Sequence, residues 1–153
     1  MLPYWKRKKK KAENGSKRKS GKPDLTKKLD KVFSQYIRLR DIMPNGYGRC
    51  IACGKIKAYA DLDCGHYFSR THMATRWDED NCHAECRGCN RFSADHLIGY
   101  RDNLLRKIGA GRYDRLTVMA HSTKHWMDCE LEAMIKHYTE EVKRLKKEKN
   151  INS

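Results

Sequence analysis

The chain has 153 residues and a formal net charge of +15; charged residues make up 35% of it and aromatic residues only 9%. A chain of this length corresponds to one ordinary domain, and so few aromatic residues predict a modest core that needs a further source of stability. No apolar run is long enough to span a bilayer, and no apolar segment follows the basic start. This argues against a membrane protein and against an exported one. We therefore expect a cytoplasmic protein.

Positive charge is concentrated in the first 22 residues, which contain ten Lys or Arg and one Glu. Like charges mixed with Gly and Ser cannot bury enough apolar surface to fold, so we predict a disordered basic arm over 1–22 and a single domain over 23–150. Such an arm suits a polyanion, because phosphate contacts release condensed counterions. Alternatively, it keeps the protein in solution or contacts an anionic membrane surface. The arm residues predicted to contact DNA are Lys6, Arg7, Lys8, Lys9, Lys10 and Lys11.

Helical periodicity appears first in the segment PDLTKKLDKVFSQYIRLRDI, where apolar residues recur every three or four positions. This pattern predicts a helix over 24–42. Asp24 or Thr26 can cap its start, and the Pro-Asn-Gly turn at 44–46 ends it.

Short apolar runs, glycines and cysteines occupy the region 47–98, which favours a compact loop-and-hairpin core over a helix. Helical periodicity returns over 98–149. One helix is closed by Gly109, and after the short segment RYDRLTVMAH a last helix starts near Asp128 as its N-cap. The predicted fold class is α+β, with a central core flanked by N- and C-terminal helices.

Four of the seven cysteines form two CxxC pairs that are 32 residues apart. Two such pairs let four thiolates converge on one structural, tetrahedral Zn²⁺, and in a chain with a small core that ion supplies much of the folding free energy. The alternatives are a redox-active CxxC or unligated core thiols, but a thioredoxin-like motif requires a βαβ frame that the pattern lacks. The predicted ligands are Cys50, Cys53, Cys86 and Cys89, which leaves free thiols at Cys64, Cys82 and Cys129.

The residues around the second pair carry a more specific pattern. NCHAECRGCN, from Asn81 to Asn90, matches the signature N-x4-C-x2-C-[HN], and the segment DCGHY, with His66, precedes it. This order resembles the HNH endonucleases, in which a zinc-held hairpin and a helix form a ββα-metal core around one catalytic cation. The segments FSQYIRLRD, CGHYFSR, RWDEDN and GYRDNLLRKIG look like those of the phage NinG (Rap) recombination nucleases. The resemblance covers residues from about 25 to 145 and leaves out the basic arm.

The resemblance implies catalytic roles for three residues. His66 corresponds to the first His of the motif, the general base, and an imidazole that titrates near neutral pH can take a proton from the attacking water. Asn81 corresponds to the central Asn, whose amide would fix the loop before the second strand and orient His66. Asn90 corresponds to the last His, and as an oxygen ligand it suits Mg²⁺ or Mn²⁺ better than a softer metal. The structural alternatives are a core or surface histidine, a turn residue and a helix cap, respectively.

One position departs from the motif. Many HNH enzymes have Asp or His immediately before the base as a second cation ligand, whereas this chain has Gly65. Asp63 would share a strand face with Gly65 and so could reach the cation. Asp61 and His83 are weaker substitutes.

These observations together predict a metal-dependent DNA endonuclease. The resemblance implies branched recombination intermediates, such as Holliday junctions and D-loops, as substrates in phage recombination, and the cytoplasm of a bacterial host as the location. Arg70 and Arg76 are candidates for clamping phosphates, with solvated arginines as the alternative. Junction resolution usually requires paired cuts, which is consistent with a homodimer.

Two other functions compete with this prediction. A catalytically silent zinc module that binds DNA or a recombination partner is the main alternative, although it has no chemical need for His66 or Asn81. An RNA-binding zinc knuckle is the third hypothesis, and the sequence lacks the aromatic stacking platform that single strands require.

Overall fold

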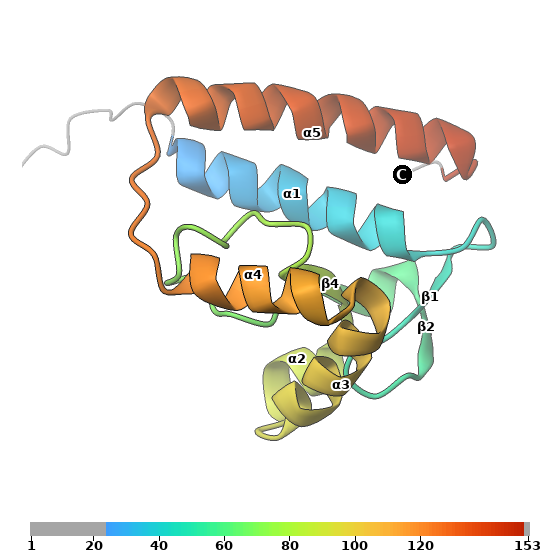
Figure 1. Ribbon diagram of the computed structural model, residues 1–153. Helices are drawn as coiled ribbons and strands as arrows, with labels where there is room; N and C mark the ends of the chain where they lie inside the picture. Colours follow the sequence, from blue (N-terminus) through green and yellow to red (C-terminus); the bar gives the residue numbers. More distant parts are fainter. Residues whose placement is uncertain (1–23, 152–153) are drawn as a thin grey trace, which may run out of the picture.

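The computed structural model describes residues 24–151. Within them the chain forms five α-helices and two antiparallel two-stranded sheets (Figure 1). The elements in chain order are α1 (Leu25–Asp41), β1 (Tyr47–Arg49), β2 (Ile56–Ala58), the 3-10 helix Tyr59–Asp61, β3 (Leu62–His66), β4 (Cys82–Cys86), α2 (Arg87–Phe92), α3 (His96–Ile108), α4 (Ala110–Ala120) and α5 (Asp128–Glu148). The predicted α+β class is confirmed, whereas the predicted basic arm lies outside the described residues.

Helices α1 and α5 run side by side although they are far apart in the sequence (Figure 1). Their apolar stripes meet through aromatic rings, with Phe33 and Tyr138 edge to face at a centroid distance of 4.9 Å. At the far end, Nζ of Lys149 donates a hydrogen bond to the backbone carbonyl of Leu39 at 2.6 Å. This bond satisfies one of the carbonyls that the last turn of a helix leaves unpaired. The pair forms the outer layer that covers the rest of the fold.

Two details of the helices differ from the sequence prediction. The segment RYDRLTVMAH, which was not predicted to be helical, lies in α4, and only Leu116 and Ala120 of this helix are buried. The N-cap of α5 is Met127, not Asp128, and its backbone N–H donates to the Glu130 carboxylate at 2.8 Å. By contrast, Asp24 caps α1 as predicted, through its Oδ1.

The hairpin β3–β4 carries most of the predicted site residues. In its register Leu62 lies opposite Cys86, and Gly65 lies opposite His83. Because side chains alternate along a strand, His66 lies on one face of the hairpin, and Asp63 and Gly65 lie on the other. Helix α2 starts directly after β4, so the order from residue 62 to residue 92 is strand, strand, helix.

The tight loop between β1 and β2 holds the first CxxC pair. The N–H of Gly54 donates to the carbonyl of Cys50, and the N–H of Cys50 donates to the carbonyl of Lys55, both at 2.9 Å. Gly54 has φ +73°, a conformation that glycine adopts without steric cost. The N–H of Ile51 donates to the carbonyl of Ala84 at 3.0 Å, which attaches this loop to β4.

Residues 67–81, the connection between β3 and β4, are fastened to α1. The Asp30 carboxylate accepts two hydrogen bonds from Arg76, and its Oδ1 accepts one from Nε1 of Trp77 at 2.9 Å. Further along, the hydroxyl of Tyr36 donates to Glu79 at 2.8 Å. Helix α1 thus holds the connection in place next to the hairpin.

Within residues 24–151, no helix combines the length and the apolar character that crossing a membrane requires.

Candidate metal and catalytic site

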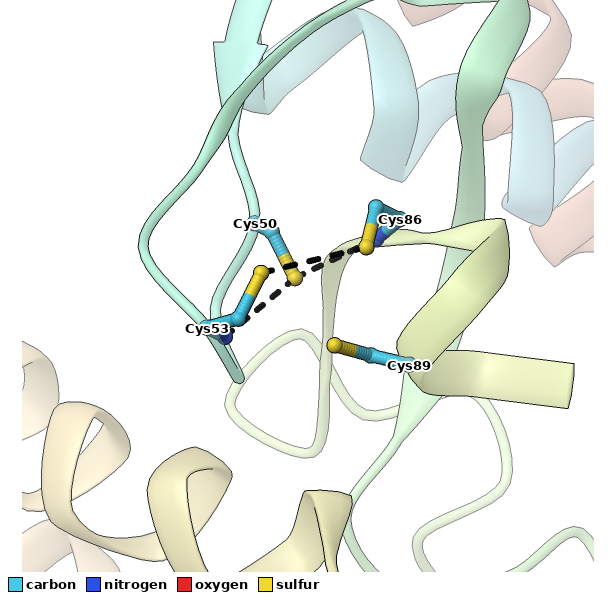
Figure 2. Close-up of side chains that lie close together, drawn as sticks. All are labelled: Cys50, Cys53, Cys86 and Cys89. Carbon is cyan, nitrogen blue, oxygen red and sulfur yellow. Dashed lines mark hydrogen bonds between the residues drawn. The ribbon is translucent and has the colours of Figure 1, made fainter. Parts of the chain in front are cut away.

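Four cysteine side chains converge where the β1–β2 loop meets the start of α2, and their sulfur atoms point toward one another (Figure 2). All four sulfurs lie within 4.8 Å of one another, and those of Cys53 and Cys86 are 3.9 Å apart. Thiolates bound tetrahedrally to Zn²⁺ at about 2.3 Å lie about 3.8 Å from each other. The cluster of Cys50, Cys53, Cys86 and Cys89 could therefore hold a metal ion such as zinc, as the CxxC spacing predicted.

Backbone N–H groups support this cluster. Sγ of Cys50 accepts hydrogen bonds from the N–H of Cys53 at 3.5 Å and from the N–H of Cys86 at 3.3 Å. Hydrogen bonds to the charged form of a group favour that form, and a metal ligand has to be a thiolate. Because Cys86 ends β4 and is the N-cap of α2, an ion here would join the first hairpin to the hairpin–helix unit.

His66 is the last residue of β3, and its ring is fixed from the loop that follows. Nε2 lies 2.9 Å from the backbone carbonyl oxygen of Arg76. A carbonyl only accepts, so Nε2 carries the proton and Nδ1 is the basic nitrogen. The same carbonyl accepts a hydrogen bond from the Cys82 thiol at 3.7 Å. The loop thus selects the tautomer of His66.

Asn81 joins the two ends of that loop. Its side chain is fully buried. Oδ1 accepts from the N–H of Phe68 at 2.8 Å, and Nδ2 donates to the carbonyls of Phe68 and Thr75, each at 2.9 Å. Three bonds from one amide fix residues on both sides of the loop, next to the Arg76 carbonyl that holds His66.

The surroundings of His66 favour the neutral imidazole. Burial lowers the pKa of His66 below its usual 6.5, and the positive charge of Arg70 lowers it further, against the opposing effect of the carbonyl acceptors. A general base has to be unprotonated to act. The lowered pKa keeps His66 in that form at neutral pH.

On the opposite face of the hairpin, Asp63 of β3 contacts Asn90 of α2. Nδ2 of Asn90 donates to Asp63 Oδ2 at 3.1 Å, and Arg91 contacts both oxygens of the same carboxylate, at 2.7 and 2.8 Å. Burial acts to raise the pKa of Asp63, but the hydrogen bonds from Arg91 and Asn90 outweigh it and hold the pKa below its usual value. The two predicted cation residues are therefore in contact, with Asp63 already paired to a guanidinium.

On the same face lies a carboxylate that the sequence prediction missed. Glu85 is opposite Asp63 in the register and is fully buried. Its Oε1 accepts a hydrogen bond from His96 Nδ1 at 2.6 Å, and its Oε2 has no hydrogen-bond partner. Burial raises the pKa of Glu85. Alternation from Cys86 along β4 could have indicated which face Glu85 occupies, but the sequence alone did not connect it to His96.

His83 is also on this face, and within residues 24–151 no hydrogen bond links it to Asp63 or Glu85. Its Nδ1 lies 3.5 Å from the Tyr100 hydroxyl, which also donates to the carbonyl of Gly65 at 2.9 Å. Burial lowers the pKa of His83 to about 3. The structure therefore assigns His83 to the packing around Tyr100. Asp61, the other weaker substitute, lies in the 3-10 helix before β3 and is exposed.

The structure separates the predicted base from the predicted cation residues. Within residues 24–151 no hydrogen bond or ion pair links His66 to Asn90 or Asp63, because they belong to opposite faces of the hairpin. The partners of His66 on its own face are Cys64 and Cys82, whose ligand atoms lie within 4.8 Å of the imidazole and of one another. Cys129 is exposed on α5.

The two arginines predicted to clamp phosphates have different surroundings. Arg76 is paired with Asp30 through Nη2 at 2.6 Å, and its side chain is only 18% exposed. This ion pair does not agree with a phosphate clamp at Arg76, because the guanidinium is used to hold the loop on α1. Arg70 is exposed, and its contact with phosphate stays a prediction. The lysines and Arg7 of the basic arm lie outside the described residues.

Comparisons with known proteins identify relatives of most of the chain. The family model described as "Bacteriophage Lambda NinG protein" matches residues 4–148. Protein ninG of Salmonella phage P22 is 32% identical over 124 residues, which cover 78% of this chain and 57% of that protein. Protein ninG of Escherichia phage lambda is 32% identical over 124 residues, covering 78% of this chain and 56% of that protein. The chain thus spans a little over half the length of these relatives. No solved structure matches.

Proposed function

The chain belongs to the NinG family, and we propose that it is a metal-dependent endonuclease of HNH type that hydrolyses phosphodiester bonds in branched DNA. The observation that carries the proposal is the way in which one loop fixes the base. Asn81 cross-links the loop, and the Arg76 carbonyl of the loop holds His66 in the tautomer whose Nδ1 is the basic nitrogen. A zinc module that only binds DNA has no chemical need for this arrangement.

The residues have separate roles in this proposal. His66, kept neutral by burial and by Arg70, takes the proton from the attacking water. Asn90 and a carboxylate of the opposite face of the hairpin would hold a divalent cation such as Mg²⁺ or Mn²⁺. When bound, that cation neutralises a non-bridging phosphate oxygen and the leaving 3′ oxygen. The four cysteines bind zinc as a structural clasp.

The charge of the chain supports DNA as the partner. The formal net charge of +15 favours association with a polyanion. Exposed cations lie near the hairpin, among them Arg70 and Arg87, and the sequence of the first 22 residues adds ten Lys or Arg. We propose the branched substrate and the homodimer because the chain resembles recombination nucleases.

A silent DNA-binding module is the alternative function. The pairing of Asp63 with Arg91 favours it, because this carboxylate is already occupied by a guanidinium.

Cutting assays on three substrates separate these two functions. With zinc-loaded protein and Mg²⁺, we expect strand breaks in a four-way junction, and slower cutting of a linear duplex and of a plasmid of matched sequence. Gel-shift assays on the same molecules measure affinity. Junction binding without strand breaks in Mg²⁺ or Mn²⁺ would contradict the nuclease and support the silent module.

The lowered pKa of His66 predicts a pH profile for cutting. Because the base form persists down to the lowered pKa, the acid limb of the rate profile should lie below pH 6.5, the usual value for His. Arg70→Ala removes a positive charge that lowers this pKa, so the acid limb should move to higher pH. The measurement is the single-turnover rate against pH, with the exposed Lys143→Ala as a charge-matched control. A phosphate contact alone would instead weaken DNA binding without moving the limb.

A further inference from the structure

We infer that Glu85 supplies a carboxylate ligand for the divalent cation. This carboxylate replaces the Asp or His ligand that is missing at position 65, where the chain has Gly65. This inference rests on the proposed function. The sequence prediction placed Asp63 in this role, whereas the structure shows Asp63 held by both nitrogens of the Arg91 fork and by Asn90. A carboxylate that is already neutralised by a bidentate arginine is a poor ligand, because the cation would have to displace the arginine.

The free oxygen of Glu85 is the first reason for the assignment. Glu85 is fully buried, and Oε2 has no hydrogen-bond partner. A buried carboxylate oxygen without a partner is costly, and coordination of a cation removes that cost. Oε1 is held by His96 Nδ1 at 2.6 Å. The histidine fixes the carboxylate through one oxygen and leaves the other oxygen available.

The position of that oxygen is the second reason. A Cβ atom built on Gly65 would overlap with Oε2 of Glu85. The carboxylate thus occupies the space into which a side chain at position 65 would extend, and it arrives from the neighbouring strand. Glu85 of β4 therefore places its carboxylate where a side chain at position 65 of β3 would lie, and the missing side chain of Gly65 leaves room for it.

Asn90 is the second ligand of the inferred site, because it contacts Asp63, the residue opposite Glu85 in the strand register. Asn90, whose Nδ2 is used by Asp63, has its Oδ1 free of hydrogen bonds within residues 24–151. Carboxylate and amide oxygens are the ligands that Mg²⁺ and Mn²⁺ prefer. The inferred cation site is made of Glu85 Oε2 and Asn90 Oδ1, with His96 as a positioning residue.

Binding of Mn²⁺ alone, without DNA, tests this inference. The electron paramagnetic resonance signal of free Mn²⁺, titrated with zinc-loaded protein, gives the number and affinity of sites. Wild type should bind one Mn²⁺, and Glu85→Gln, which has the same shape and keeps an acceptor for His96, should bind it at least about tenfold more weakly. The exposed Glu132→Gln, which removes the same charge elsewhere, should bind like wild type.

Three further variants keep the test decisive if Glu85→Gln fails to fold. Gly65→Ala should weaken Mn²⁺ binding, because its methyl group displaces Oε2, while zinc content and circular dichroism stay unchanged. Glu85→Ala should also lose Mn²⁺, and adding Gly65→Asp to it should restore binding by returning the ligand to β3. Equal Mn²⁺ affinity in wild type and Glu85→Gln, or no Mn²⁺ binding by wild type at millimolar concentration, would overturn the inference.

The outcome is independent of the nuclease assay. If Glu85→Gln loses Mn²⁺ and wild type cuts no DNA, the cation site stands and the proposed function fails. If both proteins bind Mn²⁺ equally and wild type cuts DNA, the function stands and the ligand is another residue.

Discussion

Replacing His66 by Ala should lower the rate of DNA cutting by about 10²–10⁴-fold, the usual contribution of a general base. The imidazole is proposed to act only on the attacking water, so DNA affinity and zinc content should not change. His66 contacts the loop through the hydrogen bond from Nε2 to the Arg76 carbonyl, whereas Asn81 holds the loop with three hydrogen bonds. The fold should therefore persist. The single-turnover rate on a four-way junction is the measurement.

The exposed His137 provides the matched control, because His137→Ala makes the same change on the outer side of α5. It should cut at the wild-type rate. A His66→Ala protein that cuts as fast as wild type, in a preparation free of other nucleases, would show that His66 is not the base.

Replacing Cys86 by Ser should cost the protein its metal and its fold. Cys86 belongs to the cluster of four sulfurs, ends β4 and caps α2. The free energy of zinc binding by such sites is about 10–16 kcal/mol. The usual free energy of unfolding of a small domain is about 5–15 kcal/mol, so the loss of zinc binding removes most or all of the stability. We expect loss of close to one zinc ion per chain, together with aggregation or the loss of a cooperative thermal transition.

Cys129→Ser is the control for this change, because Cys129 is exposed on α5 and is not part of the cluster. Its zinc content and melting temperature should match wild type. Metal analysis of the purified proteins decides the matter: a wild-type chain that is metal-free and yet fully folded would rule out the zinc clasp.

The sequence allowed a good prediction of the features that depend on local patterns. Helices α1 and α5 follow from apolar residues that recur with helical period, and the convergence of four thiols follows from two CxxC pairs at a suitable distance. The helix α4 was missed because it buries only Leu116 and Ala120, so its sequence shows little amphipathic pattern. The N-cap of α5 was misplaced by one residue, since an acidic residue suits both the cap and the first turn.

The features that depend on contacts between distant segments could not be predicted. The pairing of Arg76 with Asp30, 46 residues away, turns a candidate phosphate ligand into a structural residue. Likewise, only the pairing of β3 with β4 shows that the Glu85 carboxylate lies against Gly65. A motif gives the order of the residues, whereas strand pairing decides which of them meet.

Cutting of one four-way junction with and without a divalent cation tests the central claim most directly. Zinc-loaded wild type should cut it in Mg²⁺ and stop in EDTA, while circular dichroism shows that the fold persists, and excess Mg²⁺ should restore cutting. His66→Ala should show only background in every condition. Equal cutting by wild type and His66→Ala, or intact junctions that stay bound to wild type in both Mg²⁺ and Mn²⁺, would contradict the account.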